Sequence, residues 1–89
     1  MISRRIQVLG KVQGVFYRAT AKTKADDLRL VGWVRNEPDG SVVLEVQGDD
    51  AKVSQMIEWC KEGPTFSRVD QVLEEPAEPI SEKSFEIVY

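Results

Sequence analysis

The 89-residue sequence contains no histidine and only one cysteine, Cys60. The absence of histidine excludes the usual imidazole base, Ser-His and Cys-His nucleophile pairs, and most zinc or iron chemistry. A single cysteine excludes an intramolecular disulfide and argues against a cysteine-based structural zinc site. Any catalysis must therefore rest on carboxylates, amides, lysine, arginine and the backbone.

Long apolar runs and an excess of positive charge are also missing. No run approaches the roughly 20 apolar residues that a membrane span needs, and the N-terminus lacks the apolar core of a signal peptide. A net charge of -3 and a pI of about 4.9 argue against a nucleic-acid partner. We expect a single domain over residues 1–89, in the cytoplasm, as a monomer without a membrane partner.

Hydrophobic spacing predicts five strands and two helices. We expect strands over residues 5–9, 33–36, 41–46, 68–73 and 84–89, and helices over 18–30 and between Asp49 and Gly63. The order is βαββαβ with a short extra strand at the C-terminus. Right-handed crossovers then place both helices on one face of a mostly antiparallel sheet, which is the ferredoxin-like α/β sandwich, an α+β fold.

Local signals mark several boundaries. The turn over residues 37–40 contains Pro38, which presets a turn dihedral, and Gly40, which supplies a positive φ. Asp49 is placed to cap the second helix. The residues that follow Leu73, from Glu74 to Pro79, are typical of a solvated connection.

The segment from Gly10 to Arg18 joins a strand to a helix start. Free amides and a partial positive charge make helix N-termini anion sites, and Gly10 and Gly14 would let the backbone turn its amides inward. Arg18 is unfavourable beside that positive charge, by about 0.3–1 kcal/mol, unless an anion lies between them. Alternatively, Arg18 is a solvated surface residue and the glycines only form a turn.

Asn36 is polar where the alternation from Gly32 and Val34 places a core residue. An amide there can both donate to and accept from a water. On spacing alone the simpler interpretation is that Asn36 begins the turn and caps backbone amides.

Other phosphate chemistries lack their motifs. No P-loop run is present, and the residue six positions after Cys60 is Phe66 rather than the arginine of a cysteine phosphatase. Cys60 lies on the apolar face of its helix, which favours a core role. The adjacent pairs Asp26-Asp27 and Asp49-Asp50 point in different directions, which argues against a metal site.

Residues 10–18, GKVQGVFYR, resemble the first signature of the acylphosphatases, and residues 32–36, GWVRN, with 39–42, DGSV, and Gly48 resemble the second. The resemblance covers nearly the whole chain. Two positions depart from it: Arg29 stands where the family usually has glycine, and Tyr17 stands where phenylalanine is commoner. If position 29 is left-handed, arginine there costs about 1 kcal/mol relative to glycine.

The resemblance implies hydrolysis of a small-molecule acyl phosphate to a carboxylate and inorganic phosphate, without a metal or other cofactor. It makes Arg18 the phosphate-binding arginine and Asn36 the residue that orients the attacking water. The phosphate cradle would consist of backbone amides, those of Gln13, Gly14, Val15, Phe16, Tyr17 and Arg18.

Two other functions fit the same fold class. An RNA-recognition motif needs exposed aromatic residues on its central strands, and residues 41–47 contain none. A non-catalytic anion- or partner-binding module is the alternative that remains, although the presence of both Arg18 and Asn36 argues against it.

Overall fold

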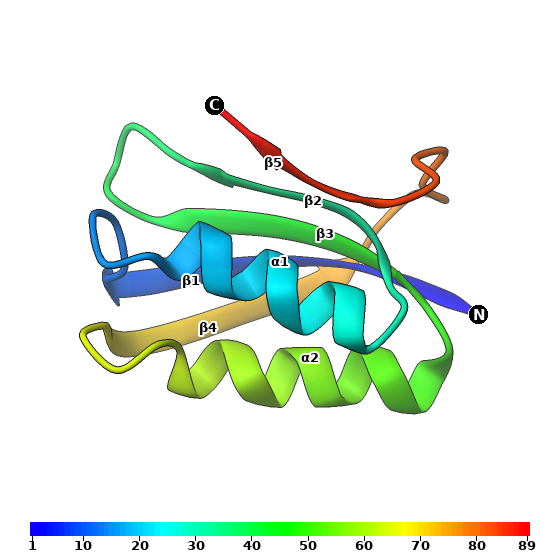
Figure 1. The fold of residues 1–89 in the computed structure, drawn as a ribbon, viewed down its shortest axis with the longest axis horizontal. Helices are drawn as coiled ribbons and strands as arrows, with labels where there is room; N and C mark the ends of the chain where they lie inside the picture. The colour runs from blue at the N-terminus through cyan, green and yellow to red at the C-terminus, as the bar shows by residue number, and fades with distance from the viewer.

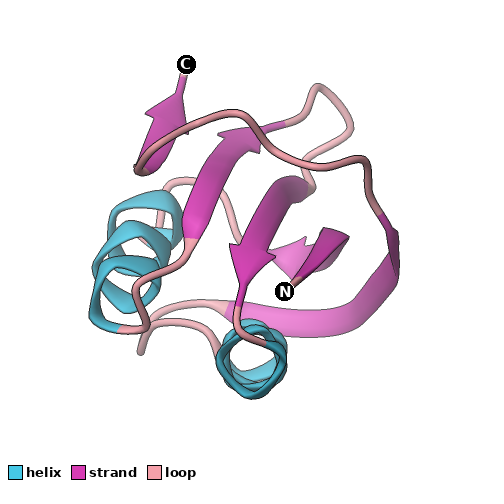
Figure 2. Ribbon diagram, turned by 90° about the vertical axis from the view of Figure 1, so that its right-hand side faces the viewer, coloured by secondary structure: helices cyan, strands magenta, loops and turns pink.

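The computed structural model describes residues 1–89 and places two helices on one face of a five-stranded sheet (Figure 1). In chain order the elements are β1 (Ile2–Lys11), α1 (Tyr17–Asp27), β2 (Val31–Asn36), β3 (Val42–Gly48), α2 (Asp50–Glu62), β4 (Arg68–Pro76) and β5 (Phe85–Val88). The sheet order is β4-β1-β3-β2-β5. Figure 2, which looks along α2, shows both helices on the same side of the strands. The ferredoxin-like α+β sandwich is therefore confirmed.

The sheet is mostly antiparallel, as expected, and has one parallel pair of strands. Three neighbouring strand pairs are antiparallel, whereas β5 runs parallel to β2 with Val34 opposite Ile87. The end of β4 pairs with the first residues of β1, and the start of β2 pairs with the end of β3. Since the end of β3 itself pairs with the first residues of β1, the end of β4 and the start of β2 lie at the same end of the sheet. The chain crosses along that end, where Ile80 donates to Gln47 Oε1 at 2.8 Å, and so enters β5 in the direction of β2.

The core lies between the sheet and the helices. On the sheet side its residues alternate along the strands, and on α1 the buried residues include Ala21 and Ala25, whose small side chains let the helix approach closely. From α2 the core receives Val53, Met56, Ile57 and Cys60. Full burial of each larger aliphatic side chain contributes roughly 1.5–3 kcal/mol.

Of the strands that are longer than the sequence predicts, β1 and β4 gain the most residues. β4 continues through Glu74 and Glu75 to Pro76, residues that we expected in a connection. β4 is an edge strand with an exposed outer side, where charged residues and proline are tolerated, so its composition does not alternate. β1 likewise extends to Lys11, so Gly10 belongs to a strand.

Gly10 has a different role from the one expected. It follows a shift in the register between β1 and β4, and a Cβ at this position would clash with the carbonyl oxygen of Arg68. The glycine thus permits a close strand contact, which the sequence alone did not indicate.

The ends of α2 agree with the local signals, whereas α1 ends at Asp27, three residues before the predicted end at residue 30. Asp49 caps α2 by accepting from Ala51 N at 3.1 Å, and Gly63 follows its last residue. Arg29, after α1, has φ 57°, so the suspected left-handed position is confirmed. Neither helix combines the length and the apolarity that a membrane crossing requires.

Candidate active site

The loop between β1 and α1 presents unpaired backbone amides. Gly14 has φ 73° and Phe16, the residue before α1, has φ 66°. No hydrogen bond within the protein is donated by the backbone amides of residues 13–16, and the first helical amide to donate is that of Thr20, to Phe16 O at 3.0 Å. These groups need acceptors, and a multivalent anion supplies several at once.

The start of α1 is positively charged. Its first turn contains no acidic residue, and no side chain caps it. Arg18, the second residue of the helix, takes part in none of the salt bridges of the chain. The helix dipole and the guanidinium therefore add to one another, and nothing in the protein neutralises them.

Asn36 is the last residue of β2 and pairs with Val42. Its Oδ1 is buried and accepts no hydrogen bond from the protein. An unpartnered buried acceptor costs about 1–3 kcal/mol, so a water is expected to bond to it. The alternative in which Asn36 caps the turn is not observed: the turn is closed by Gly40 N donating to Glu37 O at 3.1 Å, and Ser41 N donating to Asp39 Oδ1 at 2.9 Å.

A cavity of about 250 Å³ brings Arg18 and Asn36 together. It is lined by the loop and first turn of α1, by the end of β2 and by the last residues of the chain. Of the residues predicted to form the phosphate cradle, Gly14, Phe16, Tyr17 and Arg18 are among the lining residues. Gln13 and Val15 are not; Val15 is buried in the core.

The side chain of Gln13 connects the two halves of the site. Its Nε2 donates to the carbonyl oxygens of Glu37 and Ser41, at 2.7 and 2.8 Å. These residues flank the turn that follows Asn36, so the loop of Arg18 and the strand of Asn36 are held in one geometry. Sequence reasoning assigned Gln13 only a backbone role, and no local signal reveals a contact between segments more than twenty residues apart.

Tyr89 also reaches the site. The guanidinium carbon of Arg18 lies 4.8 Å from the centre of the Tyr89 ring, a cation–π contact. Val34 lies opposite Ile87 and Arg35 opposite Val88, so Tyr89 follows β5 on the side of the sheet next to Asn36. Periodicity places Tyr89 on the face of Phe85 and Ile87, but sequence alone does not place it against Arg18.

Tyr17 and Cys60 lie in the core next to the site. Tyr17 donates its hydroxyl hydrogen to the carbonyl oxygen of Cys60 at 2.8 Å, and its ring centre lies 5.2 Å from that of Trp59. Burial raises the pKa of Tyr17, and burial raises the pKa of the Cys60 thiol to about 12. Both groups stay protonated at neutral pH, which agrees with the predicted core role of Cys60.

Comparison with known proteins identifies the family. The acylphosphatase family model matches residues 4–87. The chain is 44% identical over 87 residues to an acylphosphatase of Anaeromyxobacter dehalogenans, covering 97% of this chain and 94% of the other. It is 52% identical over 68 residues to one of Methylococcus capsulatus, covering 74% of each. The crystal structure of acylphosphatase from Bacillus subtilis superposes with a TM-score of 0.95 at 34% identity, covering 100% of both chains.

Fold and comparisons thus define a hydrolase of the ferredoxin-like α+β class. The chain belongs to the acylphosphatase family, as its two signatures predict. It is an acylphosphatase enzyme, and the family acts on small-molecule acyl phosphates.

Proposed function

We propose that Arg18 and the backbone amides from Gln13 to Arg18 bind the phosphoryl group of an acyl phosphate, and that Asn36 orients the attacking water. One observation carries this proposal: a single cavity is lined by an arginine without a carboxylate partner and by an asparagine with an unpartnered buried oxygen. The first group suits a phosphate and the second suits a water.

Arg18 and the amides stabilise the negative charge of the phosphoryl group. The phosphoryl oxygens carry negative charge throughout the transfer, and donors fixed beforehand around them lower the barrier without reorganising. A guanidinium fork meets two phosphate oxygens at once, which lysine cannot do. The helix start reinforces the same attraction.

Asn36 acts on the nucleophile. Its Oδ1 accepts a hydrogen from the water, leaving an oxygen lone pair free to attack phosphorus. The new bond joins the water oxygen to phosphorus, while the bond between phosphorus and the acyl oxygen breaks. That oxygen leaves as a carboxylate, which needs no proton from the enzyme, and the protons of the water go to phosphate and solvent. Positioning therefore replaces a strong base, in agreement with a sequence without histidine.

Three further predictions from the sequence belong to the same proposal: no metal or other cofactor takes part, no nucleic acid binds, and the protein is a cytoplasmic monomer. Size-exclusion chromatography tests the last point. Elution near the chain mass of 10.1 kDa supports a monomer, and elution near twice that mass contradicts it.

Phosphate release from benzoyl phosphate by the purified protein tests the proposed chemistry. We expect release well above buffer and unchanged after EDTA. No release contradicts the proposed hydrolysis, whereas strong inhibition by EDTA contradicts the metal-free mechanism.

A further inference from the structure

Arg35 and Glu37 lie on either side of Asn36 in the chain and are joined by an ion pair. Arg35 Nε donates to Glu37 Oε2 at 3.1 Å, and Arg35 Nη2 donates to Glu37 Oε1 at 3.4 Å. Two guanidinium nitrogens thus meet both carboxylate oxygens, which is the geometry of a bidentate pair. Such a pair fixes the direction of two side chains, and here these belong to the immediate neighbours of Asn36.

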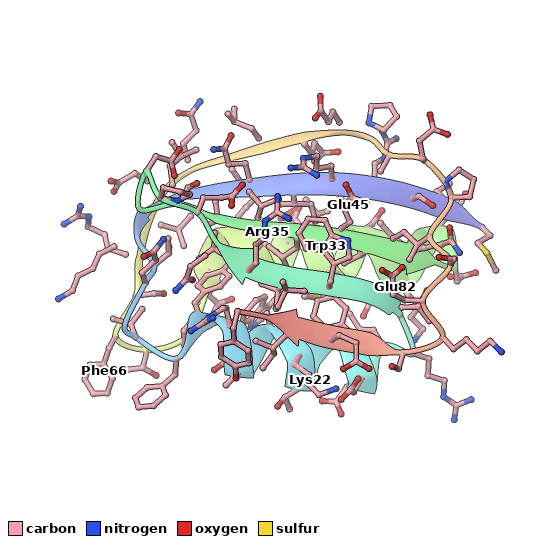
Figure 3. The ribbon with its side chains drawn as sticks, turned by 90° about the horizontal axis from the view of Figure 1, so that it is seen from above. Lys22, Trp33, Arg35, Glu45, Phe66 and Glu82 are labelled. Carbon is pink, nitrogen blue, oxygen red and sulfur yellow. The ribbon has the colours of Figure 1, made fainter.

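The ion pair lies on the face of β2 opposite to Asn36. Successive side chains of a strand point to opposite faces, and Asn36 shares the helix-facing side with Val34, which is fully buried. The guanidinium of Arg35 lies over Trp33, 4.7 Å from its ring centre, and Figure 3 shows these two residues side by side. Neither Arg35 nor Glu37 lines the cavity of the candidate active site.

The backbone around Asn36 depends on restraints from outside the strand, because Asn36 is the last residue of β2. The pairing of β2 with β5 ends at Arg35, opposite Val88, and the turn follows directly after Asn36. The loop before α1 supplies one restraint, since Gln13 Nε2 donates to the carbonyl oxygen of Glu37 at 2.7 Å. The ion pair supplies a second one, so Glu37 is held through both its backbone and its side chain.

We propose that Arg35 and Glu37 are positioning residues for the reaction: their ion pair fixes the backbone on both sides of Asn36, so that its amide holds the attacking water in line with phosphorus. This inference rests on the proposed function, in which Asn36 orients that water. Misplacement by about 1 Å can cost about 100-fold in rate, and loss of one of two restraints should cost less. The pair should affect kcat and not phosphate binding, which depends on Arg18 and the loop amides.

A matched ion pair lies on the same face of the sheet, beside the middle of β2. Arg5 bonds Glu45 at 2.6 Å and also lies over Trp33, 5.7 Å from its ring centre. The exposed fractions of these two side chains are 35% and 20%, against 39% and 24% for Arg35 and Glu37. Because the surroundings match, the pair of Arg5 and Glu45 is a control for the loss of an ion pair on this face.

The test measures kcat for benzoyl phosphate, and the inhibition constant of inorganic phosphate, in Arg35→Gln, in Glu37→Gln and in the double variant. We expect each single substitution to lower kcat about fivefold, and the double variant to lose about fivefold as well, because all three remove the same interaction. The inhibition constant should stay within about twofold of the wild-type value. Arg5→Gln and Glu45→Gln should retain kcat within about twofold.

The two substitutions at the pair change the net charge in opposite directions. A long-range electrostatic effect on the anionic substrate would therefore shift activity in opposite directions, whereas loss of the pair lowers kcat in both variants. Urea titrations should show similar changes in the free energy of unfolding for the two ion pairs, with a fall in kcat for only one of them. Multiplicative losses in the double variant, or equal losses of kcat in the control variants, would overturn the inference.

Asn36→Ala separates a failure of the positioning role from a failure of the proposed function. If Asn36→Ala loses kcat while Arg35→Gln and Glu37→Gln keep it, the positioning role is wrong and the proposed function stands. If Asn36→Ala stays fully active, or if the wild type releases no phosphate from benzoyl phosphate, the proposed function fails and the positioning role fails with it.

Discussion

Arginines occur against aromatic rings on two sides of this molecule, with opposite electrostatic surroundings. On the open face of the sheet, Arg5 and Arg35 both lie over Trp33, at 5.7 and 4.7 Å from its ring centre. Figure 3 shows Trp33, Arg35 and Glu45 gathered over the middle strands. On the helix side, Arg18 lies 4.8 Å from the ring centre of Tyr89.

The difference lies in the carboxylates. Arg5 bonds Glu45 at 2.6 Å and Arg35 bonds Glu37 at 3.1 Å, so the positive charges of the open face are neutralised within the protein. Arg18 has no such partner and lies beside unpaired amides. An aromatic neighbour is common to both regions and therefore identifies neither. The missing carboxylate, together with its place in the cavity, distinguishes Arg18 from the paired arginines of the open face.

Replacement of Arg18 should cause the largest loss of activity. We expect Arg18→Gln to lower kcat/KM for benzoyl phosphate about 1000-fold, because the fixed charge at the phosphoryl group is lost. Inhibition by inorganic phosphate should weaken in parallel. The matched control is Arg5→Gln, on the open face, which should retain activity within about twofold of wild type. Equal losses in the two variants would show that pairing does not distinguish the arginines.

Asn36→Ala should separate turnover from binding. Without an oriented water, kcat should fall about 100-fold. The inhibition constant of inorganic phosphate should stay near the wild-type value, because Arg18 and the loop amides remain in place. Steady-state kinetics with phosphate as inhibitor measures both quantities, and full activity of this variant would disprove the role of Asn36.

Gln13→Ala should have a smaller effect, since Gln13 positions other groups and does not touch the phosphoryl group through its side chain. Loss of its two hydrogen bonds to the turn should lower kcat about tenfold. Gln13→Glu should lower kcat at least as much, because a carboxylate cannot donate to the carbonyl oxygens of Glu37 and Ser41. Activity retained in both variants would argue against a connection through Gln13.

Arg29→Gly should have the smallest effect on activity and a measurable effect on stability. Arg29 is left-handed, and its amide donates to Asp26 O at 3.0 Å within the turn that ends α1. Glycine relieves the strain, so the free energy of unfolding should rise by about 1 kcal/mol in urea titrations. Lys24→Gly, inside α1, should instead lower it by about 0.5–1 kcal/mol. A lower free energy of unfolding in Arg29→Gly would show that the backbone of Arg29 is not strained.

Features encoded by neighbouring residues were predictable. Pro38 and Gly40 identify the turn, and Asp49 and Gly63 identify the ends of α2, because turn dihedrals and caps depend on a few adjacent residues. The extension of β4 was not predictable from alternation, since both charged residues and proline fit an exposed edge. The parallel direction of β5 depends on where the connecting residues cross the sheet.

In the candidate site, too, some features were predictable from the sequence and others were not. Arg18 and Asn36 emerge from the sequence through two signatures, whereas the bonds of Gln13 to the turn and the contact of Tyr89 with Arg18 join segments far apart in the chain. Such contacts leave no periodicity and no local motif. They appear only when the strand order is known.

The sequence by itself determined the order of the elements and the chemistry available to them. A chain without histidine and with a single buried cysteine has to rely on carboxylates, amides, lysine, arginine and the backbone. Only the tertiary structure decided which arginine without a carboxylate partner lines the cavity, since the twelve lysines and arginines are alike in the sequence. Charge pairing and burial depend on neighbours brought together by the sheet, and these leave Arg18 without a carboxylate and Asn36 without a partner in the same cavity.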